Sequence, residues 1–250
     1  MFKPEPVSCE HCFMEPRCWP EHAPDGSAVH VERQPPIYPG TTLWRHGTAF
    51  TGLYTVRNGC IKVMETDETG GDRVLSFAFA GDMIGLEALA SGRHETTAVA
   101  LTEAMVCFLP WPLRAEAGAD GALPLRLLQR ASTLLQQRSR AIRLADPDLS
   151  VQRFLKEIAA RIGRVEQSGG APAIRLRLPM SRMEIGQYLG YAEETVCRSM
   201  HRLRRQGEIE VSGRTLLLKS KAGAPRSAAL PALAAAPAPV RARSADSTLA

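Results

Sequence analysis

Three cysteines near the start of the chain, Cys9, Cys12 and Cys18, have residue types and spacing suited to metal binding. Two residues separate the first pair and five separate the second, a pattern that neither helix nor strand periodicity produces. It is typical of a loop around a soft metal centre, because cysteine thiolates select zinc, Cu(I) or iron–sulfur clusters. Such centres need four ligands, so the trio predicts a fourth ligand elsewhere in the chain. A disulfide or a fortuitous grouping is the simpler alternative.

The fourth ligand has local and distant candidates. His11 or His22 would complete a zinc site together with the trio. Cys107 stands in an apolar, strand-like run, where a lone cysteine ordinarily packs in the core. Because the trio needs a partner, Cys107 becomes the best candidate, and Cys60, which follows the turn residue Gly59, is its rival.

The composition is that of a globular chain of two ordinary domains. The 250 residues are 44% hydrophobic, and no apolar run approaches a membrane span. The first residues contain no apolar signal region, so we expect a cytoplasmic protein with no membrane partner. In that compartment the six cysteines are better explained as metal ligands or free thiols than as disulfides. The net charge of +5 weakly favours a polyanionic partner.

Short strand-like runs separated by turn residues occupy residues 31–120, after the cysteine-rich segment 1–30. This pattern predicts an antiparallel β-roll, that is, a jelly roll. The expected strands are 53–56, 61–64, 74–77, 98–101 and 105–109.

The pattern changes to that of one long helix over residues 121–148. Leu128, Leu135 and Ile142 recur every seven residues, which is a narrow seam of the coiled-coil kind. Such a seam on a long helix indicates a homodimer interface. Arg138 flanks it and weakens the association, because an unpaired arginine drawn into the seam is costly.

Residues 149–219 predict a winged helix-turn-helix, and 220–250 an Ala- and Pro-rich disordered tail. Ser181 and Glu184 form a capping box, Gly190 ends that helix, and a second helix runs over 193–206. The run 209–218 fits a hairpin wing. The whole chain is therefore expected to be α+β.

The second helix of this motif divides into two faces. Val196, Met200 and Leu203 face inward. The opposite face carries Glu194, Cys197, Arg198, His201, Arg202 and Arg205. Arginine can bind guanine O6 and N7, and glutamate can accept from cytosine N4, so this face predicts contact with double-stranded DNA. Arg205, near the helix end, is expected to contact phosphate.

Three stretches together resemble the oxygen-responsive FNR branch of the CRP/FNR family of bacterial transcription regulators. They are Ser8-Cys9-Glu10-His11-Cys12 with Cys18-Trp19-Pro20, then Met105-Val106-Cys107, and finally Gly190-Tyr191-Ala192-Glu193-Glu194-Thr195-Val196-Cys197-Arg198. The resemblance implies a roll like that of cyclic-nucleotide-binding domains, a dimerisation helix and a winged helix-turn-helix. It also implies that oxygen destroys or converts a cluster and thereby ends dimerisation and DNA binding.

The resemblance assigns roles to particular residues. A [4Fe–4S] cluster would be held by Cys9, Cys12, Cys18 and Cys107. DNA contacts would come from Glu194, Thr195, Cys197, Arg198 and Arg205, with Glu194 and Arg198 reading bases. Glu193 stands where cAMP-receptor-like members carry arginine, which favours a TTGAT half-site. Cys197 replaces a serine of the FNR pattern and Arg138 replaces an acidic residue. Residues 68–72 would form a loop that touches RNA polymerase.

The sequence also bears on a cyclic-nucleotide effector, on enzymatic activity and on a structural zinc site. Cyclic nucleotide is not expected, since Glu87 is present but Arg93 is followed by His94 and Glu95, so the phosphate clamp is missing. An iron–sulfur enzyme or electron carrier lacks a nucleophile constellation or a nucleotide-binding glycine motif, so the chain is not expected to be an enzyme. A regulator of the same fold with structural zinc or another effector stays open.

Overall fold

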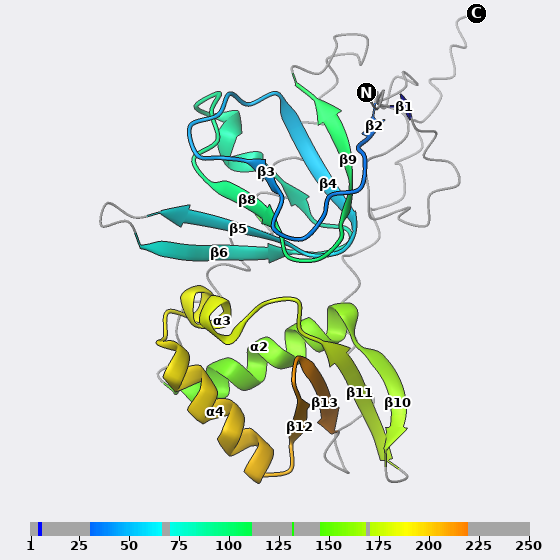
Figure 1. Cartoon of the computed structure of the whole chain (residues 1–250), viewed down its shortest axis with the longest axis vertical. Coiled ribbons are helices and arrows are strands. Elements are labelled where there is room, and N and C mark those ends of the chain that lie inside the picture. The colour runs from blue at the N-terminus through cyan, green and yellow to red at the C-terminus, as the bar shows by residue number, and fades with distance from the viewer. Residues whose placement is uncertain are drawn as a thin grey trace, which may run out of the picture.

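The computed structural model describes residues 5–6, 31–66, 71–111, 132, 146–168 and 171–219. Figure 1 shows an antiparallel β-roll in the upper half and a C-terminal domain of helices and short strands below it. No helix among the described residues is long and apolar enough to cross a membrane. Several predicted features lie outside these ranges, namely Cys9, Cys12, Cys18, Leu128, Leu135, Arg138, Ile142 and the tail 220–250.

Two antiparallel sheets build the roll. One has the strand order β1-β2-β9-β4-β7 and the other β3-β8-β5-β6. The strands are β1 (Glu5–Pro6), β2 (Glu32–Arg33), β3 (Thr42–Trp44), β4 (Gly52–Asn58), β5 (Ile61–Thr66), β6 (Asp72–Ala78), β7 (Met83–Ile84), β8 (Thr97–Ala100) and β9 (Met105–Pro110), with a 3-10 turn at Leu86–Leu89. The five predicted strands are confirmed within a residue or two, whereas the very short β1, β2, β3 and β7 were not predicted.

Strand pleating sends alternate side chains of β9 to different cores. Val106 packs with Trp44 and Val56 in the cluster between the sheets. Cys107 faces the other way and packs with Leu53 and other apolar side chains on the opposite face of its sheet. This alternation follows from the two-residue period of a strand, and it explains how an apolar run places neighbouring residues in different environments.

The C-terminal domain contains three helices and four strands in its described part. They are α2 (Pro147–Ile162), β10 (Arg164–Ser168), β11 (Ala171–Arg177), α3 (Arg182–Leu189), α4 (Glu193–Arg205), β12 (Ile209–Ser212) and β13 (Thr215–Lys219). The strands form one sheet in the order β10-β11-β13-β12. The hairpin of β10 and β11 was not predicted. The predicted α+β class, with a roll and a winged helix-turn-helix, is confirmed, while the predicted segment boundaries remain a proposal.

Asp146 and Pro147 mark the start of α2. The Asp146 side chain accepts a hydrogen bond from the Asp148 backbone N–H, and Pro147 occupies the first turn, where a missing N–H costs nothing. Val151, Phe154, Leu155 and Ile158 are buried on one face of the helix. Pro147 therefore begins α2.

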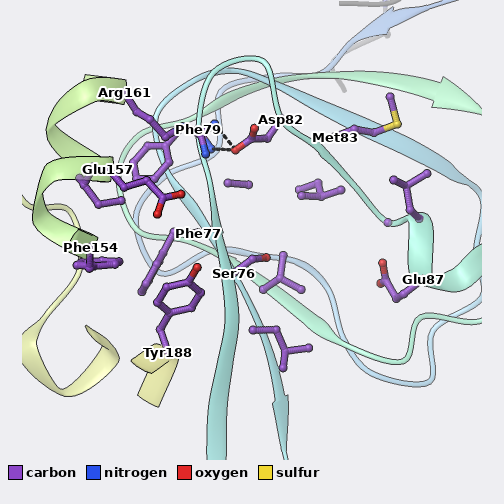
Figure 2. Close-up of a pocket in the computed structure, with 17 residues that line it drawn as sticks. Ser76, Phe77, Phe79, Asp82, Met83, Glu87, Phe154, Glu157, Arg161 and Tyr188 are labelled. Carbon is purple, nitrogen blue, oxygen red and sulfur yellow. Dashed lines mark hydrogen bonds and ion pairs between the residues drawn. The ribbon is translucent and has the colours of Figure 1, made fainter. Parts of the chain in front are cut away.

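An aromatic cluster joins the roll to the C-terminal domain. Phe77 of β6 lies 6.0 Å from Phe154 of α2 and 5.4 Å from Tyr188 of α3, measured between ring centroids. Figure 2 shows these three rings gathered beside a cavity of about 260 Å³ that both domains line. One hydrophobic core accordingly continues from β6 into the helices of the C-terminal domain.

Two ion pairs cross the same boundary. Lys62 of β5 donates from Nζ to Glu184 of α3 at 2.8 Å, and both side chains are largely buried. Arg161 of α2 binds Asp82 at 2.5 Å and lies over the Phe79 ring, 5.0 Å from its centroid. Charged hydrogen bonds shielded from water are worth more than surface pairs, so these contacts help fix how the two domains meet.

The first prediction concerns the Lys62–Glu184 pair. Burial raises the pKa of Glu184, but hydrogen bonds from Lys62 and Ser181 outweigh it and hold that pKa below its ordinary value of 4.5. A carboxyl whose pKa is lower when folded stabilises the protein above its unfolded pKa, and this is lost as the pH falls through the folded pKa. Glu184→Gln should cost about 1–3 kcal/mol of unfolding free energy at neutral pH, and the difference should vanish in acid.

Denaturant unfolding between neutral pH and about pH 3 measures this difference. Glutamine at this position keeps the capping box and removes only the charge. The matched control is Glu210→Gln, because the Glu210–Lys219 pair is 58% and 43% exposed. That change should cost less than about 1 kcal/mol. Equal losses of unfolding free energy in the two variants would show that the Lys62–Glu184 pair stabilises the protein no more than an exposed ion pair does.

Candidate nucleic-acid interface and cysteine positions

Helices α3 and α4 form the predicted helix-turn-helix. The Ser181 hydroxyl accepts from the Glu184 N–H, and the Glu184 carboxylate accepts from the Ser181 N–H, which completes the capping box. Gly190 ends α3 in the left-handed region at φ 75°, which glycine adopts without strain. A Cβ on Gly186 would lie 2.5 Å from the Tyr191 carbonyl oxygen, so glycine is needed where the turn passes closest to α3.

Helix α4 presents a line of polar side chains away from its buried face. Val196, Met200 and Leu203 are at most 3% exposed, which confirms the predicted inward face. Opposite them, four exposed side chains follow the helical repeat at intervals of four, three and four residues: Glu194, Arg198, His201 and Arg205. This line can hydrogen-bond to base edges and phosphates in a major groove. His201 is exposed in this line, on the face where the sequence predicted it.

Arg202 was expected on the same face, but the structure gives it a different partner. Its guanidinium makes two hydrogen bonds to the Asp148 carboxylate in the first turn of α2, at 2.6 and 2.7 Å. The hydrogen bond from Arg202 is the main reason why the pKa of Asp148 lies below its ordinary value. Arg202 therefore joins α4 to α2 and does not belong to the polar line. Helical spacing alone could not separate it from its neighbours.

The remaining predicted contacts lie at the edges of the line. Cys197 is half-buried, and its Sγ accepts from Arg182 Nη1 of α3 at 3.5 Å. Thr195 accepts from Arg198 Nη2 at 3.5 Å. Arg182 was not predicted, because nothing in its sequence context indicates that it reaches the second helix. With Arg182, Arg198 and Arg205, the exposed side of the motif is strongly positive, which suits a polyanion.

Strands β12 and β13 form the predicted wing. They pair from Ile209 with Leu218 to Ser212 with Thr215, around a turn at Gly213. Ile209 packs in the same core as Val196, Met200 and Leu203, so the hairpin is held against α4. The wing and helix-turn-helix thus form one rigid unit.

Cys107 is buried in β9, with 4% of its surface exposed. Its backbone is paired on one side with Thr55 of β4 and on the other with Arg33 of β2. Arg33 is in turn paired with Glu5 of β1. Neighbouring strands lie about 4.8 Å apart, so the backbone at Glu5 is about 10 Å from that at Cys107. Strand β1, which precedes the cysteine trio in sequence, therefore lies in the same sheet as β9 with β2 between them.

Cys60 lies at the other end of the roll. It is 1% exposed and packs in the core shared with Phe154 and Leu155 of α2. Burial, assisted by the charges of Asp82 and Glu184, raises the pKa of its thiol well above the ordinary value and outweighs the opposite effect of Arg161. A metal ligand must be a thiolate, so this environment disfavours ligation by Cys60.

Among the described residues, no three His, Cys, Asp or Glu side chains gather as a metal site. Of the four predicted ligands only Cys107 lies in the described ranges, so the set as a whole remains a prediction. The chemistry of the donors nevertheless fits an iron–sulfur group, because all four are sulfur and β1, which ends three residues before Cys9, lies two strand spacings from β9.

Glu87 and Arg93, which were compared with a nucleotide-binding clamp, each contact other residues of the roll. The Glu87 carboxylate accepts from Thr96 Oγ1 at 2.8 Å and contacts His94 Nδ1 at 3.2 Å. His94 stacks on Trp44, and Arg93 donates to the Gly47 carbonyl at 2.9 Å. Neither Glu87 nor Arg93 is held toward a shared ligand.

Comparison with known proteins agrees with this architecture. Residues 36–112 match the family model of the cyclic nucleotide-binding domain, and residues 151–223 match that of the Crp-like helix-turn-helix domain. The solved structure of FixK2 from Bradyrhizobium japonicum superposes with a TM-score of 0.64 at 24% identity, covering 76% of this chain and 93% of that one. A roll of the cyclic nucleotide-binding kind joined to a Crp-like helix-turn-helix defines a DNA-binding transcription regulator.

Full-length relatives narrow the class. The fumarate and nitrate reduction regulatory protein of Salmonella typhimurium is 31% identical over 219 residues, covering 86% of this chain and 87% of that protein. The anaerobic regulatory protein of Aggregatibacter actinomycetemcomitans is 30% identical over 223 residues, covering 86% of each. The chain belongs to the CRP/FNR family of transcription regulators, in its FNR branch. These relatives are regulators and not enzymes, which confirms that prediction.

The second prediction separates the arginines of α4. Arg198→Ala should lower the binding free energy for a specific operator by roughly 1–3 kcal/mol and relax the base preference at one position of the site. Arg205→Ala should weaken operator and random-sequence duplex alike and lower the salt dependence by about one phosphate contact. Fluorescence anisotropy on the operator, its single-base variants and a random duplex measures both effects.

Arg202→Ala is the matched control, because it removes an arginine of the same helix that binds Asp148. It should leave base preference unchanged and lower stability by at most about 1 kcal/mol, since the pair is half-exposed. A uniform loss on every duplex for Arg198→Ala would contradict its base-reading role.

Proposed function

We propose that this regulator senses oxygen through a [4Fe–4S] cluster held by Cys9, Cys12, Cys18 and Cys107. The cluster would control pairing of two copies and binding to a palindrome of TTGAT-type half-sites. The printed names of its relatives, a fumarate and nitrate reduction regulator and an anaerobic regulator, agree with an anaerobic role. Cyclic nucleotide is not part of the proposal.

One observation carries this proposal, the ladder β1-β2-β9. It brings the backbone of Glu5, four residues before Cys9, to within about two strand spacings of Cys107. Four residues span at most about 14 Å when extended. Cys9 can therefore reach Cys107 without any change in β1, and the rest of the trio follows in the same segment.

The two rival ligand arrangements receive less support. Cys60 lies in the core next to α2, in an environment that keeps its thiol protonated. A zinc site that used His11 or His22 would be complete within the N-terminal segment and would need no strand of the roll. The pairing of β1 with β2 beside β9 would then have no role in the site.

The chain's own residues would turn cluster occupancy into DNA binding. When bound, the cluster would supply reactivity toward oxygen. Cys107 would tie the N-terminal segment to β9, and β9 leads directly into the predicted dimer helix 121–148. Pairing through Leu128, Leu135 and Ile142 would place two α4 helices one DNA turn apart. Family regulators of this kind act as dimers, and the turn near residues 68–72 would contact RNA polymerase.

The third prediction tests the fourth ligand. Cys107→Ala should abolish the brown colour of anaerobically purified protein and its specific DNA binding. Cys60→Ala is the matched control at a second buried cysteine, and it should retain both iron and sulfide. Visible absorption, iron and sulfide assays and gel shifts on TTGAT palindromes give the result.

A cluster that survives in Cys107→Ala but is lost in Cys60→Ala would move the fourth ligand to Cys60. A colourless, air-stable wild-type protein that contains zinc would replace the oxygen-sensing proposal with a structural metal site.

The fourth prediction concerns assembly. Wild-type protein should sediment largely as a dimer without oxygen and shift toward monomer in air, because the predicted seam is narrow. Arg138→Ala should strengthen the dimer in both conditions, since it removes a charge beside the seam. Arg130→Ala, in the same predicted helix away from the seam, is the control. Identical mass with and without oxygen would refute control of assembly by the cluster.

A further inference from the structure

Thr55 of β4 carries a buried hydroxyl that has no hydrogen-bond partner. The residue is 2% exposed, and its Oγ1 is unpaired in the structure. A buried hydroxyl without a partner destabilises a fold, so such groups are uncommon. Ser199 Oγ shows the same feature, but it lies beside the Asp148 carboxylate and contributes to lowering the pKa of that group. Thr55 has no comparable neighbour in the described structure.

The position of Thr55 indicates what its partner could be. In the sheet register Thr55 is directly opposite Cys107 of β9 on one side and Met83 of β7 on the other. Directly opposed residues of antiparallel strands share a face, with Cβ atoms about 4.5–5.5 Å apart. The apolar side chains packed on this face include Leu53 and Leu109. Of the two residues directly opposite Thr55, only Cys107 has a side chain that can become a charged hydrogen-bond acceptor, because the thioether of Met83 stays neutral.

We propose that the Thr55 hydroxyl donates a hydrogen bond to sulfur at the site that Cys107 occupies, either the Cys107 thiolate or a sulfide of the cluster. This inference rests on the proposed cluster site. A neutral thiol is a weak acceptor, whereas a thiolate or sulfide carries negative charge and accepts strongly. Thr55 is thus a positioning residue, which has no partner until the sulfur is charged.

The hydrogen bond has a consequence for oxygen sensitivity. A donor to sulfur stabilises the more negatively charged, reduced form of an iron–sulfur group and raises its reduction potential. The Thr55 hydroxyl would therefore make the cluster harder to oxidise. Its loss should lower the potential and shorten the lifetime of the cluster in air.

Thr55→Val and Thr55→Ser in the full chain separate this role from packing. Valine keeps the branched shape of threonine and removes the hydroxyl, whereas serine keeps the hydroxyl. Each protein is reconstituted anaerobically, and its iron and sulfide content, midpoint potential and half-life of visible absorbance in air are measured. Thr55→Val should load normally, show a more negative potential and lose its colour roughly two- to tenfold faster. Thr55→Ser should stay close to wild type.

Two further measurements keep the inference falsifiable. Thr42→Val, in β3 of the other sheet, should change neither potential nor half-life. Metal-free Thr55→Val should melt at or above the wild-type temperature, because it removes an unpaired buried hydroxyl. A lower melting temperature, or an unchanged potential and half-life in loaded Thr55→Val, would overturn the role. If wild-type protein takes up no cluster, the proposed function itself fails, and the two failures are distinguishable.

Discussion

The Glu184 carboxylate holds together the parts of this regulator that must act as one. One oxygen accepts from the Ser181 N–H and thereby fixes the start of α3, and the other accepts from Lys62 of the roll. Removing the carboxylate would leave a buried lysine and an uncapped helix at the same place. The first helix of the DNA-binding motif is consequently positioned by a residue of the sensor-type domain as well as by its own domain.

A second set of contacts runs from the neighbourhood of Cys107 to α2. Cys107 is paired with Thr55, and Thr55 is paired with Met83 of β7. Asp82, the residue before Met83, binds Arg161 of α2 and accepts from the Phe79 N–H. Only backbone pairing and one ion pair separate the predicted ligand from the helix that supports α4. This connection lies within one copy of the chain and does not involve the predicted dimer helix.

Local patterns predicted the local structure well. The Ser181–Glu184 capping box, the Gly190 helix end and the inward face of α4 all follow from short-range spacing. Long-range partners could not be predicted in this way, because Lys62 and Glu184 are 122 residues apart in sequence. The β10–β11 hairpin was missed because its first strand, Arg164–Ser168, contains one apolar residue and so gives no alternating apolar pattern. The partner of Arg202 could not be predicted either, because Asp148 belongs to another helix.

The two buried cysteines of the roll differ in their surroundings and not in their exposure. Cys60 and Cys107 are 1% and 4% exposed, and both stand in or beside strands of the roll. Cys60 lies near Asp82 and Glu184, whose negative charges oppose a thiolate. These two carboxylates also form the ion pairs between the roll and the C-terminal domain. Cys107 faces the opposite side, next to an unpaired hydroxyl and the strands that lead to the N-terminus. A thiolate at Cys60 is opposed mainly by burial and also by two carboxylates, which together outweigh the charge of Arg161, so these surroundings favour Cys107 as the proposed fourth ligand.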